Sequence, residues 1–149
     1  MPVNDSVAAI LKQKGSRVWT IPGDATVFEA IQLMAARNIG ALVVVSDGKL
    51  EGIFSERDYT RKVALHGKSS KETLVSDVLS QPLLVATPES TIEECMRVMT
   101  GNRVRHLPVI EGDTLVGLIS IGDLVNWIIS VQSVEILQLQ NYISGQYPG

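Results

Sequence analysis

An internal repeat constrains the fold of this 149-residue chain more than any other feature. The stretch Gly52–Asp58, GIFSERD, returns 65 positions later as Gly117–Asp123, GLISIGD. With that offset, residues 26–59 align with residues 91–124 without a gap, and nine of the 34 pairs are identical. In each copy a short apolar run ends in a serine and an aspartate. This pattern is typical of a strand that runs into the first turn of a helix.

Each copy reads as a β-α-β-β-α unit. The first unit has a short β-type run over 17–21 and a helix over 26–37 that Thr26 or Asp24 can cap. Strands over 41–45 and 50–54 joined by Asp47-Gly48 follow, and then a helix from Ser55 to about residue 65. The second has strands over 83–86, 104–110 and 115–119, a helix capped by Thr91, and a helix from Ser120. Because each small sheet leaves a face open, we expect the two units to stack about a pseudo-two-fold axis.

The predicted fold class is α+β, α/β-like, with an extra helix at each end. The expected divisions are an N-terminal helix in 1–16, the first repeat in 17–66, a linker in 67–82, the second repeat in 83–130, and a C-terminal helix and tail in 131–149. The N-terminal helix should cover 4–14, and a short helix is expected near 75–79. A final amphipathic helix over 131–144 carries Ile136, Leu139 and Ile143 on one face.

Composition excludes several classes of protein. Hydrophobic residues make up 45% of the chain and charged residues 19%, which is globular. The net charge is -3 and the basic residues are scattered, which argues against a nucleic-acid partner. No apolar run is long enough for a membrane helix and the N-terminus does not resemble a signal peptide, so a cytoplasmic location is expected. Cys95 is the only cysteine and is expected to be a small buried thiol.

The two units together resemble the tandem cystathionine-β-synthase (CBS) domain pair, also called a Bateman module, of the stand-alone bacterial type. The resemblance covers roughly residues 15–130 and rests on three segments: Phe54–Tyr59, Arg105–Val109 and Ser120–Leu124. It implies a module that binds an adenosine-containing ligand in the cleft between the units and regulates another protein. It also implies a flat homodimer formed through helices, with the last helix extending or locking it.

The Ser-x-x-Asp endings suit adenosine recognition. One carboxylate can accept hydrogen bonds from both ribose hydroxyls, so Asp58 and Asp123 are candidate ribose contacts beside Ser55 and Ser120. The alternative is a capping box, in which the hydroxyl and the carboxylate only satisfy helix N–H groups. The two interpretations are compatible, because the serine can cap the helix while the aspartate faces the cleft.

The resemblance assigns roles to further residues. Arg105 and His106 occupy phosphate-contacting positions, and Arg57 lies near the cleft. The two sites should therefore bind differently, and the second, near Arg105 and His106, is expected to hold phosphate more firmly. The remaining candidates are expected to line the nucleotide sites, four of them with backbone atoms at the adenine: Thr20, Pro22, Thr87 and Pro88, together with Ala41 and Pro108.

The expected function is therefore a regulatory sensor of energy or redox state that binds AMP, ADP, ATP or NAD and signals to an unidentified partner protein. The alternative is a dimerisation or docking domain that needs no ligand. The sequence contains no phosphate-binding glycine loop, no group of residues with metal-ligand spacing and no recognisable nucleophile-base pair. We therefore expect no catalysis.

Overall fold

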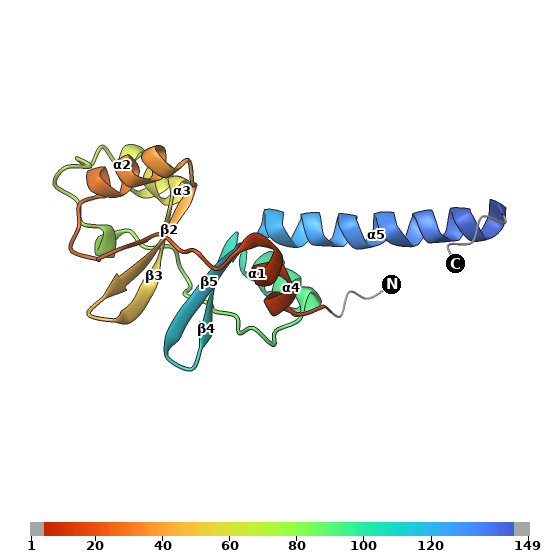
Figure 1. Ribbon diagram of the computed structural model, residues 1–149. Coiled ribbons are helices and arrows are strands. Elements are labelled where there is room, and N and C mark those ends of the chain that lie inside the picture. Colours follow the sequence, from red (N-terminus) through yellow and green to blue (C-terminus); the bar gives the residue numbers. More distant parts are fainter. Residues whose placement is uncertain (1–4, 145–149) are drawn as a thin grey trace.

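The computed structural model describes residues 5–144, apart from the side chains of residues 135 and 141–144. It has two lobes of similar build and one long helix that projects away from them (Figure 1). Residues 1–4 and the predicted tail 145–149 lie outside the described residues.

The first lobe is a three-stranded sheet with helices on one side. Strand β1 (Thr20–Ile21) pairs parallel with β2 (Ala41–Ser46), which pairs antiparallel with β3 (Lys49–Ser55). Helix α2 (Val27–Arg37) connects β1 to β2, and the Thr26 side chain accepts a hydrogen bond from the Glu29 N–H, as the predicted cap requires. Both Asp47 and Gly48 have positive φ, the conformation of a tight hairpin turn.

The second lobe repeats this plan with a smaller sheet. Helix α4 (Ile92–Asn102) starts at the Thr91 cap, and strands β4 (His106–Glu111) and β5 (Thr114–Ser120) form an antiparallel pair. The strand expected over 83–86 is wrong in extent, since only Ala86 pairs, in a single parallel bridge with Val109. Leu83 and Val85, which precede Ala86, are exposed, so burial does not hold a longer strand against the sheet.

The helix expected from Ser55 to about residue 65 has two parts. A short α-helix, α3 (Glu56–Asp58), passes into a π-helix, η1 (Tyr59–Ala64). The wider turn is seen in the Leu65 N–H, which donates to the Thr60 carbonyl five residues back at 3.0 Å. Such π-turns are frequent at functional sites.

The chain ends in one helix where two were expected. Helix α5 (Ile121–Ser144) starts at the second repeat and runs through the boundary predicted at 130/131. Between Asp123 and Ser144 there is no glycine or proline to stop it, which explains its continuity. In the described part of the chain, no helix has the length and apolar character needed to cross a membrane.

The segment that precedes each repeat packs on the other repeat. Helix α1 (Val7–Lys14) places Val7 and Ile10 in the core of the second lobe. The linker turn η2 (Val75–Asp77), which stands in place of the expected helix over 75–79, is a 3₁₀ turn, and Val75 and Val78 enter the core of the first lobe.

The backbone contacts of this exchange are equivalent in the two lobes. The Val7 N–H donates to the Ser90 carbonyl at 2.8 Å, and the Val75 N–H donates to the Ala25 carbonyl at 2.9 Å. Ala25 and Ser90 are related by the repeat offset. The exchange therefore ties the lobes together and brings the linker beside the end of β3.

Candidate functional site

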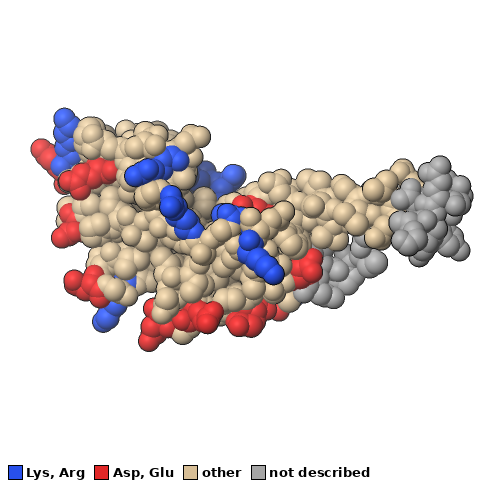
Figure 2. All heavy atoms as spheres, in the orientation of Figure 1, with Lys and Arg blue, Asp and Glu red and all other residues tan. Residues whose placement is uncertain are grey.

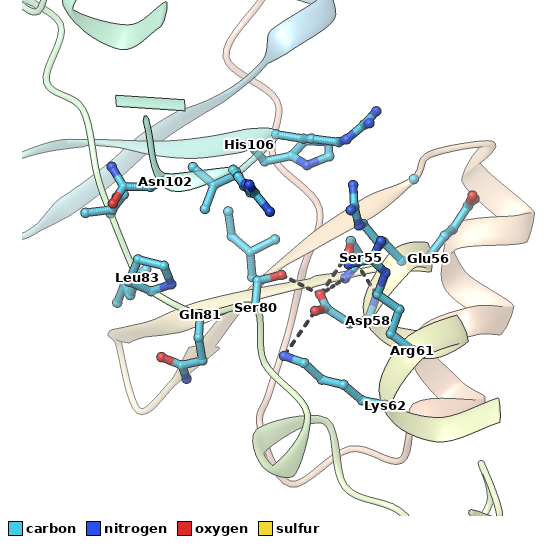
Figure 3. Close-up of a pocket in the computed structure, with 18 residues that line it drawn as sticks. Ser55, Glu56, Asp58, Arg61, Lys62, Ser80, Gln81, Leu83, Asn102 and His106 are labelled. Carbon is cyan, nitrogen blue, oxygen red and sulfur yellow. Dashed lines mark hydrogen bonds and ion pairs between the residues drawn. The ribbon is translucent and has the colours of Figure 1, made fainter. Parts of the chain in front are cut away.

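A cavity of about 650 Å³ lies between the lobes. Its walls come from four parts of the chain: Gly40 before β2, the β3–α3 corner with η1, the linker residues 80–84, and the turn 102–106 from α4 into β4 (Figure 3). Because both repeats and the linker contribute, a ligand held there would contact both lobes and the segment that joins them. The volume is within the range of ordinary small-molecule sites.

Asp58 is the buried charge in the wall of this cavity. It is 7% exposed, and its Oδ2 accepts hydrogen bonds from the Ser55 N–H at 2.9 Å and the Ser55 hydroxyl at 2.8 Å. The Ser80 hydroxyl also donates to Oδ2, and Lys62 Nζ lies 3.3 Å from Oδ1 (Figure 3). Ser55 also caps α3, since its hydroxyl accepts from the Asp58 N–H. The capping box is thus present, and its carboxylate also faces the cavity.

The cavity wall is predominantly basic. It contains five basic residues and two acidic ones: Arg57, Arg61, Lys62, Arg103 and Arg105 against Glu56 and Asp58. In Figure 2 the lysine and arginine side chains gather along the hollow between the lobes, whereas acidic side chains gather at the lower edge. Apolar side chains complete the wall: Ile53, Pro82, Leu83, Leu84 and Val104. An anionic ligand with one apolar end fits this lining best.

His106 lies between the two Ser-x-x-Asp corners. It pairs with Ser120 across β4 and β5 and also lines the cavity beside the first corner. Burial lowers its pKa, the cations Lys14 and Arg105 lower it further, and the carboxylates of Asp123 and Asp58 act in the opposite sense. The neutral imidazole is therefore favoured, so it offers one donor and one acceptor rather than a charge.

The second corner is contacted by helix α1. Asp123 Oδ2 accepts from the Ser120 N–H at 2.8 Å and from Lys14 Nζ at 2.6 Å, and Lys14 also donates to the Leu118 carbonyl at 2.8 Å. Burial alone would raise the pKa of Asp123, but the hydrogen bonds from Lys14 and Ser120 outweigh it and lower the pKa. The carboxylate at this corner is thus neutralised by the chain's own lysine.

The structure brings five of the predicted site residues together: Ser55, Arg57, Asp58, Arg105 and His106 all line the cavity. The Arg105 carbonyl accepts from the Ile121 N–H at 2.9 Å at the second corner, and Arg105 is also among the residues that line the cavity beside the first corner. The other eight candidates do not line this cavity: Thr20, Pro22, Ala41, Thr87, Pro88, Pro108, Ser120 and Asp123. Ala41 and Pro108 are buried within strands.

Sequence reasoning left seven polar residues of the cavity wall out of the predicted site: Glu56, Arg61, Lys62, Ser80, Gln81, Asn102 and Arg103. A signal for Ser80 exists in the sequence. Residues 6–11, SVAAIL, resemble residues 74–79, LVSDVL, at an offset of 68. That match indicates that residues 74–79 correspond to the helix before the first repeat. Ser80 follows this segment directly, so the match would have predicted that Ser80 lies against a repeat.

Comparison with known proteins decides the family. The family model "CBS domain" matches residues 14–65 and 75–130. This chain belongs to the CBS-domain family. The two matched segments correspond to the two lobes, so the chain carries a CBS domain pair, a kind of module that is generally regulatory and ligand-binding.

Relatives of similar size support the assignment. The CBS domain-containing protein CBSX3, mitochondrial, of Arabidopsis thaliana is 40% identical, covering 95% of this chain and 73% of that protein. The CBS domain-containing protein YhcV of Bacillus subtilis is 33% identical, covering 73% and 77% of the two chains. A solved CBS-domain structure from Burkholderia ambifaria, of a protein named for signal transduction, is 45% identical with a TM-score of 0.79 and covers 84% and 94%. None of these three names is that of an enzyme.

Proposed function

We propose that this CBS pair is a regulatory module that binds an adenine nucleotide in the cavity between its lobes. The observation that carries the proposal is the buried Asp58 carboxylate in a cavity wall rich in arginine and lysine. A carboxylate matches the adjacent hydroxyls of a ribose, and guanidinium groups match phosphate oxygens in pairs. The apolar part of the wall, including Leu83 and Leu84, suits an adenine ring. The ligand class is AMP, ADP, ATP or NAD.

The charges of the wall favour a ligand with several phosphates. Five basic side chains against two acidic ones leave a surplus of three positive charges. A triphosphate therefore gains more from this field than a monophosphate does. In the proposed complex Asp58 accepts from the ribose, and Lys62 turns from Asp58 Oδ1 toward the phosphates. We accordingly expect ATP and ADP to bind more tightly than AMP.

The proposed regulation uses the position of the cavity. Because both lobes and the linker line it, a nucleotide bound there stabilises one arrangement of the lobes over others. The shift is limited by the difference in affinity between those arrangements. We propose that a homodimer transmits it to a regulated protein. The cytoplasmic location is part of this proposal, while the Arabidopsis relative is named mitochondrial.

The test is a calorimetric titration of the full chain with ATP, ADP, AMP and NAD. We expect Asp58→Asn to weaken ATP binding by at least about 10-fold, because the loss of one hydrogen-bonded charge has that size. The double variant Arg57→Gln/Arg105→Gln should narrow the preference of ATP over AMP. Asp123→Asn is the matched control and should stay within about threefold of the wild type, because Asp123 does not line the cavity. Equal binding by the wild type and Asp58→Asn would overturn the proposal.

A ligand-independent dimerisation or docking domain is the second candidate. One observation favours it: both oxygens of Asp58 already have partners within the chain. A wild-type protein that binds none of the four nucleotides would support this candidate.

A further inference from the structure

Helix α5 has two apolar faces, and only one of them belongs to a core. Leu124 is fully buried in the second lobe, and Trp127 and Ile128 pack against the same core. Beyond these residues the helix leaves the lobe and projects away from it (Figure 1). Its projecting part is therefore not explained by the packing of the CBS pair.

The second face is a stripe of exposed aliphatic residues. Val125 is 39% exposed, Ile129 54%, Ile136 57% and Leu139 60%. Together with Gln132 these positions follow spacings of four, three, four and three residues, which average 3.5. We call Val125, Ile129, Gln132, Ile136 and Leu139 the α5 stripe. Residues spaced in this way stay on one side of a helix that winds around another.

The charge pattern identifies what can cover the α5 stripe. Asp123 and Glu135 are the only charged residues of α5, and neither belongs to the stripe. A second copy of the same helix can therefore meet the stripe without repulsion between like charges. The helix contains no lysine or arginine, whereas helices that lie on membrane surfaces are rich in them on their polar face. The visible side of the projecting helix likewise shows no basic side chains (Figure 2).

We propose that the α5 stripe is the contact between two copies of this chain, whose α5 helices form a short coiled coil. Gln132 is the middle of the five stripe positions, so the two Gln132 amides meet at the two-fold axis and hydrogen-bond to each other. A single polar residue at such a position fixes the register of a coiled coil. This inference specifies the contact of the homodimer proposed above and rests on that part of the proposal, but it does not depend on nucleotide binding.

The test is sedimentation equilibrium of the full chain, without nucleotide, from about 1 to about 500 µM. The stripe variant is Ile136→Gln/Leu139→Gln. The matched control is Val134→Gln/Leu137→Gln, which replaces aliphatic residues that are similarly exposed, 53% and 57%, but lie outside the stripe. We expect the stripe variant to raise the dimer dissociation constant at least about 50-fold and the control to change it less than about threefold. Gln132→Leu should lower the dissociation constant or produce larger oligomers, because it removes the polar residue that fixes the register.

Three results on self-association would overturn the inference. They are a wild-type protein that stays monomeric throughout the range, a dimer that the stripe variant leaves intact, and equal weakening by the stripe and control variants. Circular dichroism of both variants checks that α5 is retained. Co-sedimentation with phosphatidylcholine vesicles tests whether lipid covers the α5 stripe instead. Binding of the wild type but not of the stripe variant to these vesicles would also overturn the inference. Calorimetry with ATP on the stripe variant separates this inference from the nucleotide proposal, since unchanged ATP binding is expected even where the dimer is lost.

Discussion

The two Ser-x-x-Asp corners share one backbone plan and differ in what the chain places against them. At the first corner the Ser80 N–H donates to the Ile53 carbonyl at 2.8 Å, and its hydroxyl donates to Asp58. At the second corner Lys14 Nζ donates both to the Leu118 carbonyl, which is the repeat equivalent of Ile53, and to Asp123. The exchanged segments thus occupy equivalent places, but one supplies a small neutral group and the other a long cation.

This difference shows how two repeated sites can become asymmetric although both keep the Ser-x-x-Asp motif. A serine beside Asp58 leaves room for the cavity and leaves its basic lining available to an anion. A lysine beside Asp123 supplies the positive charge from within the chain. Ser80 and Lys14 lie outside the repeated motif, in segments that come before the repeats, and the first corner differs further within its own repeat, where Lys62 pairs with Asp58. Four changes test this comparison.

Removal of the two carboxylates should give the largest contrast. Asp58→Ala leaves four donors, two from Ser55 and one each from Ser80 and Lys62, beside a buried position and is expected to cost about 2–4 kcal/mol of unfolding free energy. Asp123→Ala should cost about 1 kcal/mol, because its side chain is 23% exposed and Lys14 can turn to solvent. Urea denaturation of both variants without nucleotide measures the two costs. Equal losses would mean that the corners are held with the same strength.

The glycines that precede the corners should give the next largest contrast. A Cβ at Gly117 would lie 2.7 Å from Leu11 Cδ2, whereas a Cβ at Gly52 would lie 3.2 Å from Leu79 Cδ1. Gly117→Ala is therefore expected to cost about 1–2 kcal/mol through overpacking and Gly52→Ala less than about 1 kcal/mol.

A double-mutant cycle supplies the control for this glycine prediction. Leu11→Ala should be less harmful in the Gly117→Ala background than in the wild type, because it removes the atoms in conflict. Additive losses in the cycle would contradict the close contact between α1 and β5.

The sequence could predict the elements of each repeat better than the contacts between them. Thr26 and Thr91 cap their helices as expected because capping depends on residues three positions apart. The exchange of α1 and η2 was not predicted, because a periodic apolar pattern identifies a buried face and not the element that covers it. For the same reason the sequence predicted Arg105 to lie near Asp123, whereas the cavity that Arg105 lines contains Asp58 and not Asp123.

The remaining differences from the sequence prediction also concern tertiary structure. The π-helix after Asp58 depends on backbone hydrogen bonds that residue spacing does not reveal. The thiol of Cys95 was correctly predicted to be buried, since it lies on the apolar face of α4. Burial, and to a smaller extent the negative charge of Glu94, raises the pKa of this thiol to about 11. Positions fixed by local periodicity are therefore predictable, whereas the cavity depends on which segments meet.

Replacement of His106 is expected to have a smaller effect on folding stability, with a distinct dependence on pH. Its folded-state pKa lies below the ordinary value of 6.5, first because of burial and then because of Lys14. Between these two pKa values the unfolded chain binds more protons, so folding stability is lost as pH falls from about 7 through 6.5 toward the folded-state pKa. His106→Gln should flatten this part of the profile in urea titrations at a series of pH values. His66→Gln, at an exposed linker residue, is the control and should leave the profile unchanged.

The smallest expected effect is that of Lys14→Met at the second corner. The ion pair with Asp123 is partly exposed, since the Lys14 side chain is 38% accessible, so its loss should cost only about 0.5 kcal/mol at neutral pH and low salt. Because the folded-state pKa of Asp123 is lowered, the stability that this carboxylate contributes is present above its unfolded value of 3.8 and is lost as pH falls through the folded value. The difference between Lys14→Met and the wild type should therefore vanish in acid and shrink in about 1 M salt. Lys12→Met, on the same helix and exposed, serves as the control. A Lys14→Met cost that does not respond to salt or pH would assign the role of Lys14 to packing of its aliphatic stem on β5 rather than to its charge.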